Sequence, residues 1–173
     1  MIERNTYAPA DAKTVLSWIN DEKTMKMWSR NAFSSFPITE DDLNSYYLAK
    51  AEEGSFFPMS FFEDGALIGH ALMTLDCDVA RLGFIIIDPE LRGKGIGKKI
   101  VSLALEFAFC QSNVNEATLY VYDKNASAYN CYVKLGFKQT PRENDLRFDF
   151  FDDEWLFRLM KITKKEYLVS KLN

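Results

Sequence analysis

The residues with the clearest potential for chemistry lie at positions 92–99, where the chain reads RGKGIGKK. Its glycines are Gly93, Gly95 and Gly97, and its cations are Arg92, Lys94, Lys98 and Lys99. Glycines let backbone N–H groups face a ligand without obstruction by Cβ. An apolar helix pattern begins near Gly95, and a helix N-terminus carries about half a positive charge. This stretch therefore predicts a pyrophosphate site, against the alternative of a solvated basic loop.

Two common glycine loops do not fit these residues. With Gly97 and Lys98 as the G-K pair of a G-x-x-x-x-G-K-[ST] loop, Arg92 stands where the first glycine is needed and Lys99 where Ser or Thr is needed. The dinucleotide fingerprint G-x-G-x-x-G fails because its third glycine would fall on Lys98 or Ile100. A general nucleotide-binding protein is therefore only a minor alternative.

Two motifs together carry a resemblance to a known family. Residues 92–97 match the (Q/R)-x-x-G-x-(G/A) loop of the GNAT-superfamily N-acetyltransferases. Residues 125–137, NASAYNCYVKLGF, resemble the superfamily's N-x-x-A-x-x-x-Y-x-K-L-G-F segment. The resemblance extends over nearly the whole chain, and its two ends look like the subgroup of ribosomal-protein N-terminal and spermidine-type acetyltransferases.

The resemblance implies the fold, the co-substrate and the residues that bind it. The expected fold is an α+β, three-layer GNAT acyltransferase fold, with a mixed, mostly antiparallel sheet in which two neighbouring strands splay apart. Acetyl-CoA is the expected co-substrate, with no metal, and residues 1–173 form one acetyltransferase domain. The residues that the resemblance assigns to the coenzyme are Ile85, Ile86, Ile87, Arg92, Gly93, Lys94, Gly95, Ile96, Gly97, Lys98 and Asn125. The three isoleucines would offer strand backbone to the pantetheine arm, and the loop would hold the pyrophosphate.

Tyr132 is the candidate catalytic residue. By resemblance it stands near the coenzyme sulfur and protonates the departing thiolate, which needs only a weak acid because a thiol has a pKa near ~8.5. The alternative is a tyrosine packed in the core. Tyr129 falls on the wrong motif position and is interpreted as packing. Cys131 is not expected to act as a nucleophile, because adjacent helix residues point to different faces.

The group that removes the proton of the amine is not identified. Relatives place a glutamate early in the strand before the loop, but here that strand begins Arg81-Leu82-Gly83. Asp76, Asp78 and the single histidine, His70, remain open candidates. A strand N–H near Ile85 could stabilise the developing oxyanion.

The expected acceptor is an amine-bearing small molecule or a peptide N-terminus. The activity would be N-acetyl transfer by direct attack in a ternary complex. Aromatic residues of the N-terminal region could grip the acceptor, although such residues more often lie in the core. They are Trp28, Phe33, Phe36, Tyr46 and Tyr47. The alternative function is a non-catalytic acetyl-CoA-binding or sensing module.

Composition narrows the class of protein. The net charge of −4 disfavours a nucleic-acid partner, and no apolar run reaches the ~20 residues of a membrane span. Three widely spaced cysteines and no signal-peptide pattern favour the cytoplasm. The oligomeric state is open, with a homodimer as one assembly.

The hydrophobic periodicity predicts the elements that must position these residues. The expected strands are residues 1–7, two strands within 55–76 joined at Asp64-Gly65, 80–87, 116–122, 146–151 and 154–162. The expected helices are residues 9–20, 21–29, 39–54, 97–112 and 125–136. Trp28 and Phe33 are assigned to the loop region after the second helix, and the end of strand 80–87 is expected to be buried on both faces.

Overall fold

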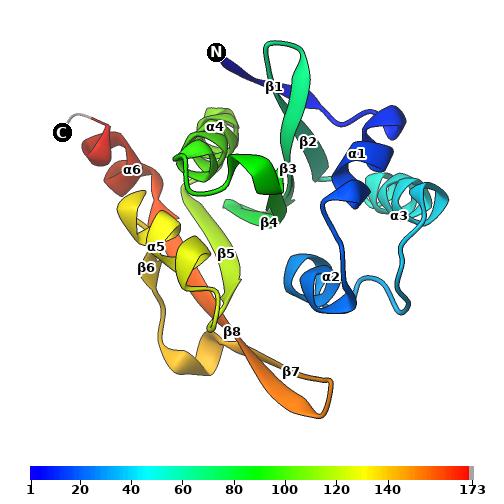
Figure 1. Cartoon of the computed structure of the whole chain (residues 1–173). Helices are drawn as coiled ribbons and strands as arrows, with labels where there is room; N and C mark the ends of the chain where they lie inside the picture. Colours follow the sequence, from blue (N-terminus) through cyan, green and yellow to red (C-terminus); the bar gives the residue numbers. More distant parts are fainter. Residues whose placement is uncertain (172–173) are drawn as a thin grey trace.

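The computed structural model describes residues 1–171, which form one eight-stranded sheet with helices on both faces (Figure 1). The strands are β1 (Ile2–Thr6), β2 (Phe56–Glu63), β3 (Ala66–Asp76), β4 (Val79–Ile87), β5 (Glu116–Tyr122), β6 (Lys138–Gln139), β7 (Leu146–Phe150) and β8 (Asp153–Thr163). The α-helices are α1 (Ala12–Ser17), α2 (Glu22–Ser29), α3 (Glu40–Glu52), α4 (Ile96–Cys110), α5 (Ala126–Lys134) and α6 (Lys164–Ser170). Short 3₁₀ turns are η1 (Pro9–Asp11), η2 (Pro89–Leu91) and η3 (Arg142–Asn144).

The sheet is mixed, as predicted. Its strand order is β1-β2-β3-β4-β5-β8-β6, with β7 paired to β8, and every pair is antiparallel except β4 with β5. The parallel pair joins Val79–Leu82 to Glu116–Leu119 and goes no further. Beyond Leu82 the two strands therefore separate, which confirms the expected splayed pair.

A β-bulge lies where the strands separate. Against β3, the partner of Leu72 is Gly83 and the partner of His70 is Ile86, so β4 carries one extra residue there. Phe84 within it adopts φ +49°, a conformation that non-glycine residues seldom adopt. An extra residue bends a strand and increases its twist, which accounts for the departure of β4 from β5.

Local sequence signals explain where several elements begin. Thr39 and Asp42 form the capping box at the start of α3, with Thr39 Oγ1 accepting from the Asp42 N–H at 3.1 Å. Asp64 and Gly65 turn the β2–β3 hairpin with φ of +52° and +82°, the positive values that a type I′ turn requires. Asn125 caps α5 through its side chain. These starts agree with the predictions.

Four details differ from the predictions. The first helix is shorter than expected: α1 ends at Ser17 rather than at Asn20. Trp28 lies in the last turn of α2, not in the loop after it, and its side chain is buried. The end of β4 is not uniformly buried, because Ile86 is buried while Ile85 and Ile87 are partly exposed. Strand β6 and helix α6 were not expected, since each is too short to show a clear period.

Two hydrophobic clusters occupy the two faces of the sheet. Helices α1, α2 and α3 cover β2 to β4 on one face, while α4 and α5 lie on the opposite side (Figure 1). Alternating residues of β4 contribute to both clusters: Ile86 packs with the N-terminal helices, and Ile85 and Ile87 pack against the cluster of α4 and α5. No helix within residues 1–171 is long and apolar enough to cross a membrane.

Candidate active site

The glycine loop leads directly into α4. Gly93 and Gly95 have φ of +77° and +81°, and Gly95 is the N-cap residue of the helix. A Cβ added at either glycine would meet nothing within 4 Å, so the space in front of the loop is open. The cations Arg92, Lys94 and Lys98 are exposed around it. This is a backbone cradle at a helix N-terminus, which suits a diphosphate.

The remaining loop residues pack inward. The Ile96 side chain is buried, so only its backbone can face a ligand. Gly97 is held by close packing: an added Cβ would lie 2.9 Å from Ile87 Cδ1 and 3.7 Å from Cys131 Sγ. Gly97 therefore lets the end of β4, the first turn of α4, and α5 approach one another.

Strand β4 offers an unpaired backbone edge beside this loop. Among the described residues, β5 pairs with none of the β4 residues from Gly83 to Ile87. The indole Nε1 of Trp28 donates to the Phe84 carbonyl at 2.7 Å, which holds the bulge against α2. An extended ligand arm can add to such an edge as a further strand. The segment Ile85–Ile87 has the location that its predicted role requires.

Helix α5, whose Cys131 lies beside Gly97 in the first turn of α4, carries the candidate proton donor Tyr132. Asn125 Oδ1 accepts from the Ala128 N–H at 3.2 Å, which confirms the cap. Tyr132 is 7% exposed and packs against Phe137, with ring centroids 6.0 Å apart. No residue of the described chain forms a hydrogen bond with the Tyr132 hydroxyl. Burial, followed by the neighbouring Cys131 thiol, raises the pKa of Tyr132 well above its ordinary value, so the phenol stays protonated.

The three candidate bases lie in unfavourable places. His70 is fully buried, its Nε2 is 2.7 Å from the Tyr47 hydroxyl, and its Nδ1 has no partner within residues 1–171. Burial lowers the pKa of His70 from 6.5 to about 3, which makes it a weak base. Asp76 and Asp78 are exposed at the β3–β4 turn. Asp78 is five residues before Gly83, about 16 Å along a strand.

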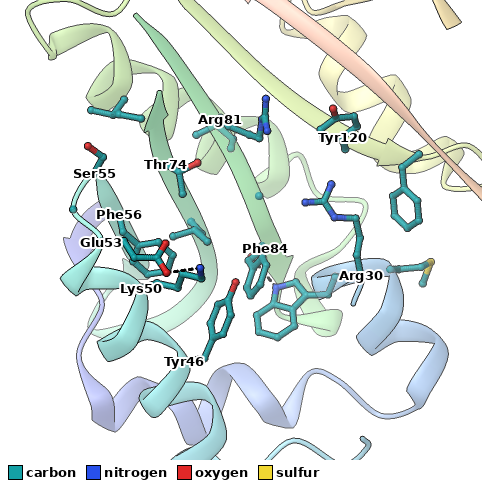
Figure 2. Close-up of a pocket in the computed structure, with 18 residues that line it drawn as sticks. Arg30, Tyr46, Lys50, Glu53, Ser55, Phe56, Thr74, Arg81, Phe84 and Tyr120 are labelled. Atoms are coloured by element: carbon teal, nitrogen blue, oxygen red, sulfur yellow. Dashed lines mark hydrogen bonds and ion pairs between the residues drawn. The ribbon is translucent and has the colours of Figure 1, made fainter. Parts of the chain in front are cut away.

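A cavity of about 490 Å³ opens where β4 leaves β5 (Figure 2). Its floor contains Leu82, Gly83 and Phe84 of β4 and Tyr120 of β5, and its far wall comes from α2 and α3. Of the aromatic residues that could grip an acceptor, Trp28 and Tyr46 line it, and both also pack in the cluster of the N-terminal helices. The other three aromatic residues do not line the cavity. They are Phe33 and Tyr47, which are buried in the core, and Phe36, which is exposed.

Charged side chains divide this cavity into two sides. Figure 2 shows the guanidinium groups of Arg30 and Arg81 close to Tyr120 on one side, and the Lys50–Glu53 pair on the other. Lys50 Nζ donates to Glu53 Oε1 at 2.7 Å. Reasoning from sequence missed Arg30, Lys50, Glu53 and Tyr120, because they come from three separate segments, the end of α2, the end of α3, and β5. The one available signal was the start of this strand, Arg81-Leu82-Gly83, which carries a cation and no acid.

The described residues hold no group of three or more His, Cys, Asp or Glu side chains that could bind a metal. The site accordingly consists of a backbone cradle, an open strand edge, a buried tyrosine and a partly cationic cavity. These features lie along β4, in the order cavity, bulge, open edge and cradle.

Comparison with known proteins assigns this arrangement to a family. The profile described as "Acetyltransferase (GNAT) family" matches residues 15–137. Peptidyl-lysine N-acetyltransferase YjaB of Salmonella typhimurium is 33% identical over 129 residues, which cover 70% of this chain and 79% of that protein. Spermidine N(1)-acetyltransferase of Escherichia coli K12 is 28% identical over 142 residues, covering 82% of this chain and 73% of that protein.

Solved structures share the fold over almost the full length. The spermidine N-acetyltransferase of Vibrio cholerae in complex with CoA and spermine superimposes with a TM-score of 0.78 at 21% identity, covering 96% of this chain and 98% of that one. Aminoglycoside acetyltransferase AAC(6')-Ib in complex with coenzyme A gives a TM-score of 0.74 at 19% identity, covering 99% of both chains. At these identities the superpositions establish the fold.

Proposed function

This chain belongs to the acetyltransferase (GNAT) family and is an acetyl-CoA-dependent N-acetyltransferase that acts on an amine, and from that premise we propose which of its residues bind and transfer the acetyl group. The observation that carries the proposal is the separation of β4 from β5 after Leu82, with a glycine cradle at one end of the open edge and a cavity at the other.

The coenzyme would bind along the second half of β4. Backbone amides around Gly93, Gly95, Ile96 and Gly97 would face the diphosphate, and Arg92, Lys94 and Lys98 would add positive charge. The open glycine surfaces and their positive φ values support this role. Ile85, Ile86 and Ile87 would pair through their backbone with the pantetheine arm. Asn125 would contribute from its position at the start of α5.

The reaction forms a bond from the amine nitrogen to the acetyl carbon and breaks the bond from that carbon to sulfur. The amine must lose a proton, and the sulfur must gain one or share one. Tyr132 would supply a hydrogen bond to the sulfur from a phenol that burial keeps neutral. A β4 N–H in the bulge near Ile85 would stabilise the carbonyl oxygen as it gains negative charge. The group that accepts the amine proton is not assigned, because His70 is buried with a lowered pKa and Asp76 and Asp78 lie at the β3–β4 turn.

The acceptor would enter the cavity beside the bulge, opposite the coenzyme. The names of the relatives, spermidine and peptidyl-lysine acetyltransferases, support a primary amine. We further propose that residues 1–173 act as one domain, because a single sheet includes strands from both ends of the chain. Three free cysteines support a cytoplasmic location. A homodimer is compatible with the proposed site, which uses residues of one chain.

A thiol-release assay tests the proposed function. Acetyl-CoA is mixed with the protein and a panel of small amines, polyamines and peptides with free N-termini, and CoA release is followed. We expect turnover with at least one amine. Binding of acetyl-CoA without turnover for any amine would instead support a coenzyme-sensing module. Stronger thermal protection by ATP than by CoA would contradict the coenzyme assignment.

A further inference from the structure

The cavity beside the bulge contains two guanidinium groups that have no anionic partner. Arg30 is the C-cap residue of α2, and Arg81 is an exposed residue of β4 that pairs with Thr118 of β5 within the parallel register. No carboxylate within residues 1–171 forms an ion pair with either arginine. The single acid lining the cavity, Glu53, is already bound to Lys50 at 2.7 Å. The cavity therefore has an excess of positive charge in a protein whose net charge is −4.

Both arginines are held against the same aromatic ring. The guanidinium carbon of Arg30 lies 5.1 Å from the Tyr120 ring centroid, and that of Arg81 lies 5.5 Å from it. Figure 2 shows both guanidinium groups turned toward Tyr120 at the edge of the cavity. Stacking on a ring restrains an arginine while leaving its N–H groups free to donate. Two like charges next to the same ring repel each other unless an anion lies between them.

Arg30 is also held in an unfavourable state. Its backbone has φ +55° and ψ −116°, and its side chain is half-buried, although it has no counter-ion among the described residues. Burial lowers the pKa of Arg30 below its ordinary value, and the charge of Arg81 acts in the same direction. A half-buried cation on a strained backbone is stabilised when a ligand supplies an anion, and the exposed Arg81 adds to the positive charge of the same cavity.

This second cationic position is too far from the cradle to serve the coenzyme diphosphate. Arg81 precedes Ile87 by six residues, about 20 Å along a strand, and the glycine loop lies beyond Ile87. We propose, on the basis of the function inferred above, that Arg30 and Arg81 bind an anionic group of the acceptor, so that the substrate is a primary amine carrying a carboxylate or a phosphate. Such an acceptor differs in charge from a polyamine, whose cationic chain these arginines would repel.

Matched amines test this proposal. The measurement is kcat/KM for γ-aminobutyrate against n-butylamine, for O-phosphoethanolamine against ethanolamine, and for spermidine. We expect at least one anionic amine to exceed its neutral partner by about tenfold or more, since charge-assisted bidentate contacts to arginine are strong. The carboxylate and phosphate pairs distinguish the two anions. Preference for spermidine or for both neutral amines would overturn the proposal.

Substitutions of Arg30 and Arg81 test whether these two arginines cause the preference for anionic amines. In Arg81→Gln and Arg30→Gln, the ratio of kcat/KM for the anionic amine to kcat/KM for its neutral partner should fall by about tenfold. Arg81→Lys should retain part of the preference for the anionic amine. Lys13→Gln, which removes an exposed cation of α1, is the matched control and should change nothing. The acetyl-CoA Kd should stay unchanged in every variant. An unchanged ratio in Arg81→Gln, or weaker acetyl-CoA binding without any change in that ratio, would contradict the assignment.

The proposal can fail independently of the acetyltransferase assignment. If no amine is turned over, calorimetric binding of O-phosphoethanolamine and of ethanolamine to the CoA-bound protein still compares an anion with its neutral partner. Tighter binding of the phosphorylated amine that is lost in Arg81→Gln would support the anion position. Equal binding of the two amines would reject it.

Discussion

The two ends of β4 present positive charge in different ways. At the loop end, α4 begins after Gly95, the space beside Gly93 and Gly95 is open, and the nearby cations are exposed. At the bulge end, positive charge comes from the side chains of Arg30 and Arg81, which rest against Tyr120. A cradle of backbone depends on conformation and little on neighbouring side chains. A cavity of side chains depends on their identity, so under the proposed assignment acceptor choice can change while coenzyme binding is retained.

The largest effect on acetyl-CoA binding is expected from Gly95→Val, which disrupts the backbone cradle. Valine resists φ of +81° and places methyl groups in the open space in front of the loop, so acetyl-CoA Kd should rise by about 100-fold in calorimetry. Gly65→Val is the matched control, because Gly65 has φ +82° and equally open surroundings in the β2–β3 turn. It should cost similar stability and leave the Kd unchanged. Equal Kd values for both variants would refute the cradle.

Tyr132→Phe should have the next largest effect, and on kcat alone. Loss of the hydroxyl should lower kcat by about 10- to 100-fold in steady-state kinetics, with little change in acetyl-CoA KM. Because no described residue binds this hydroxyl, the free energy of unfolding should change by less than about 0.5 kcal/mol. Tyr129→Phe serves as the control on the same helix. A kcat within twofold of wild type would contradict the catalytic role and indicate that Tyr132 only packs in the core.

A smaller effect is expected from Arg92→Ala, which tests whether side chains matter at the loop end. Arg92 is exposed and its Nε donates to the Ile87 carbonyl at 3.4 Å. Its loss should weaken acetyl-CoA binding by about fivefold at low ionic strength and by less at high salt. Arg142→Ala, an exposed arginine of η3, should have no effect. A 100-fold loss in Arg92→Ala would mean that side chains, not backbone, dominate this end.

The smallest expected effect is on the free energy of unfolding. It concerns His70, which lies on β3 between the two ends of β4. Its pKa is about 3 in the folded protein against 6.5 ordinarily, so the unfolded chain binds the proton more readily. The neutral ring therefore favours folding above pH 6.5, and that stability is lost as the pH falls toward 3. Between pH 7.5 and pH 6.0 the loss should be ~0.8 kcal/mol.

Comparison with His70→Gln isolates the contribution of His70 to the pH dependence of stability, because the carboxylates titrate alike in both proteins. Urea unfolding at the two pH values should show the smaller loss in the variant. The pH dependence of kcat/KM above pH 6 should be the same in both. A shifted kinetic midpoint would instead make His70 a participant in proton transfer.

The loop end of the site could be predicted in detail because local rules govern it. Glycine spacing at residues 93–97, an Asn cap at position 125 and the period of α4 are each read within one segment. The bulge at Phe84 could not be predicted in this way, since it depends on pairing with β3. Nor could the approach of Arg30 to Tyr120, which are ninety residues apart in sequence.

Side-chain environment was the other feature beyond reach of sequence. The sequence around His70 indicates a strand but does not show whether the side chain is exposed or buried. The packing of α3 places Tyr47 over the imidazole ring. The opposite holds for Thr39 and Asp42, whose capping box is complete within four consecutive residues. Prediction succeeded where partners are neighbours in the chain and failed where they are neighbours only in space.

The hydrogen bond from Trp28 to the Phe84 carbonyl gives the molecule an intrinsic optical reporter. This indole lines the cavity in which we propose that the acceptor binds, whereas Trp18 and Trp155 do not. Its emission should respond when a ligand alters the polarity beside it, and Trp28→Phe should silence that response. Acceptor binding could then be titrated by fluorescence without a label and without turnover.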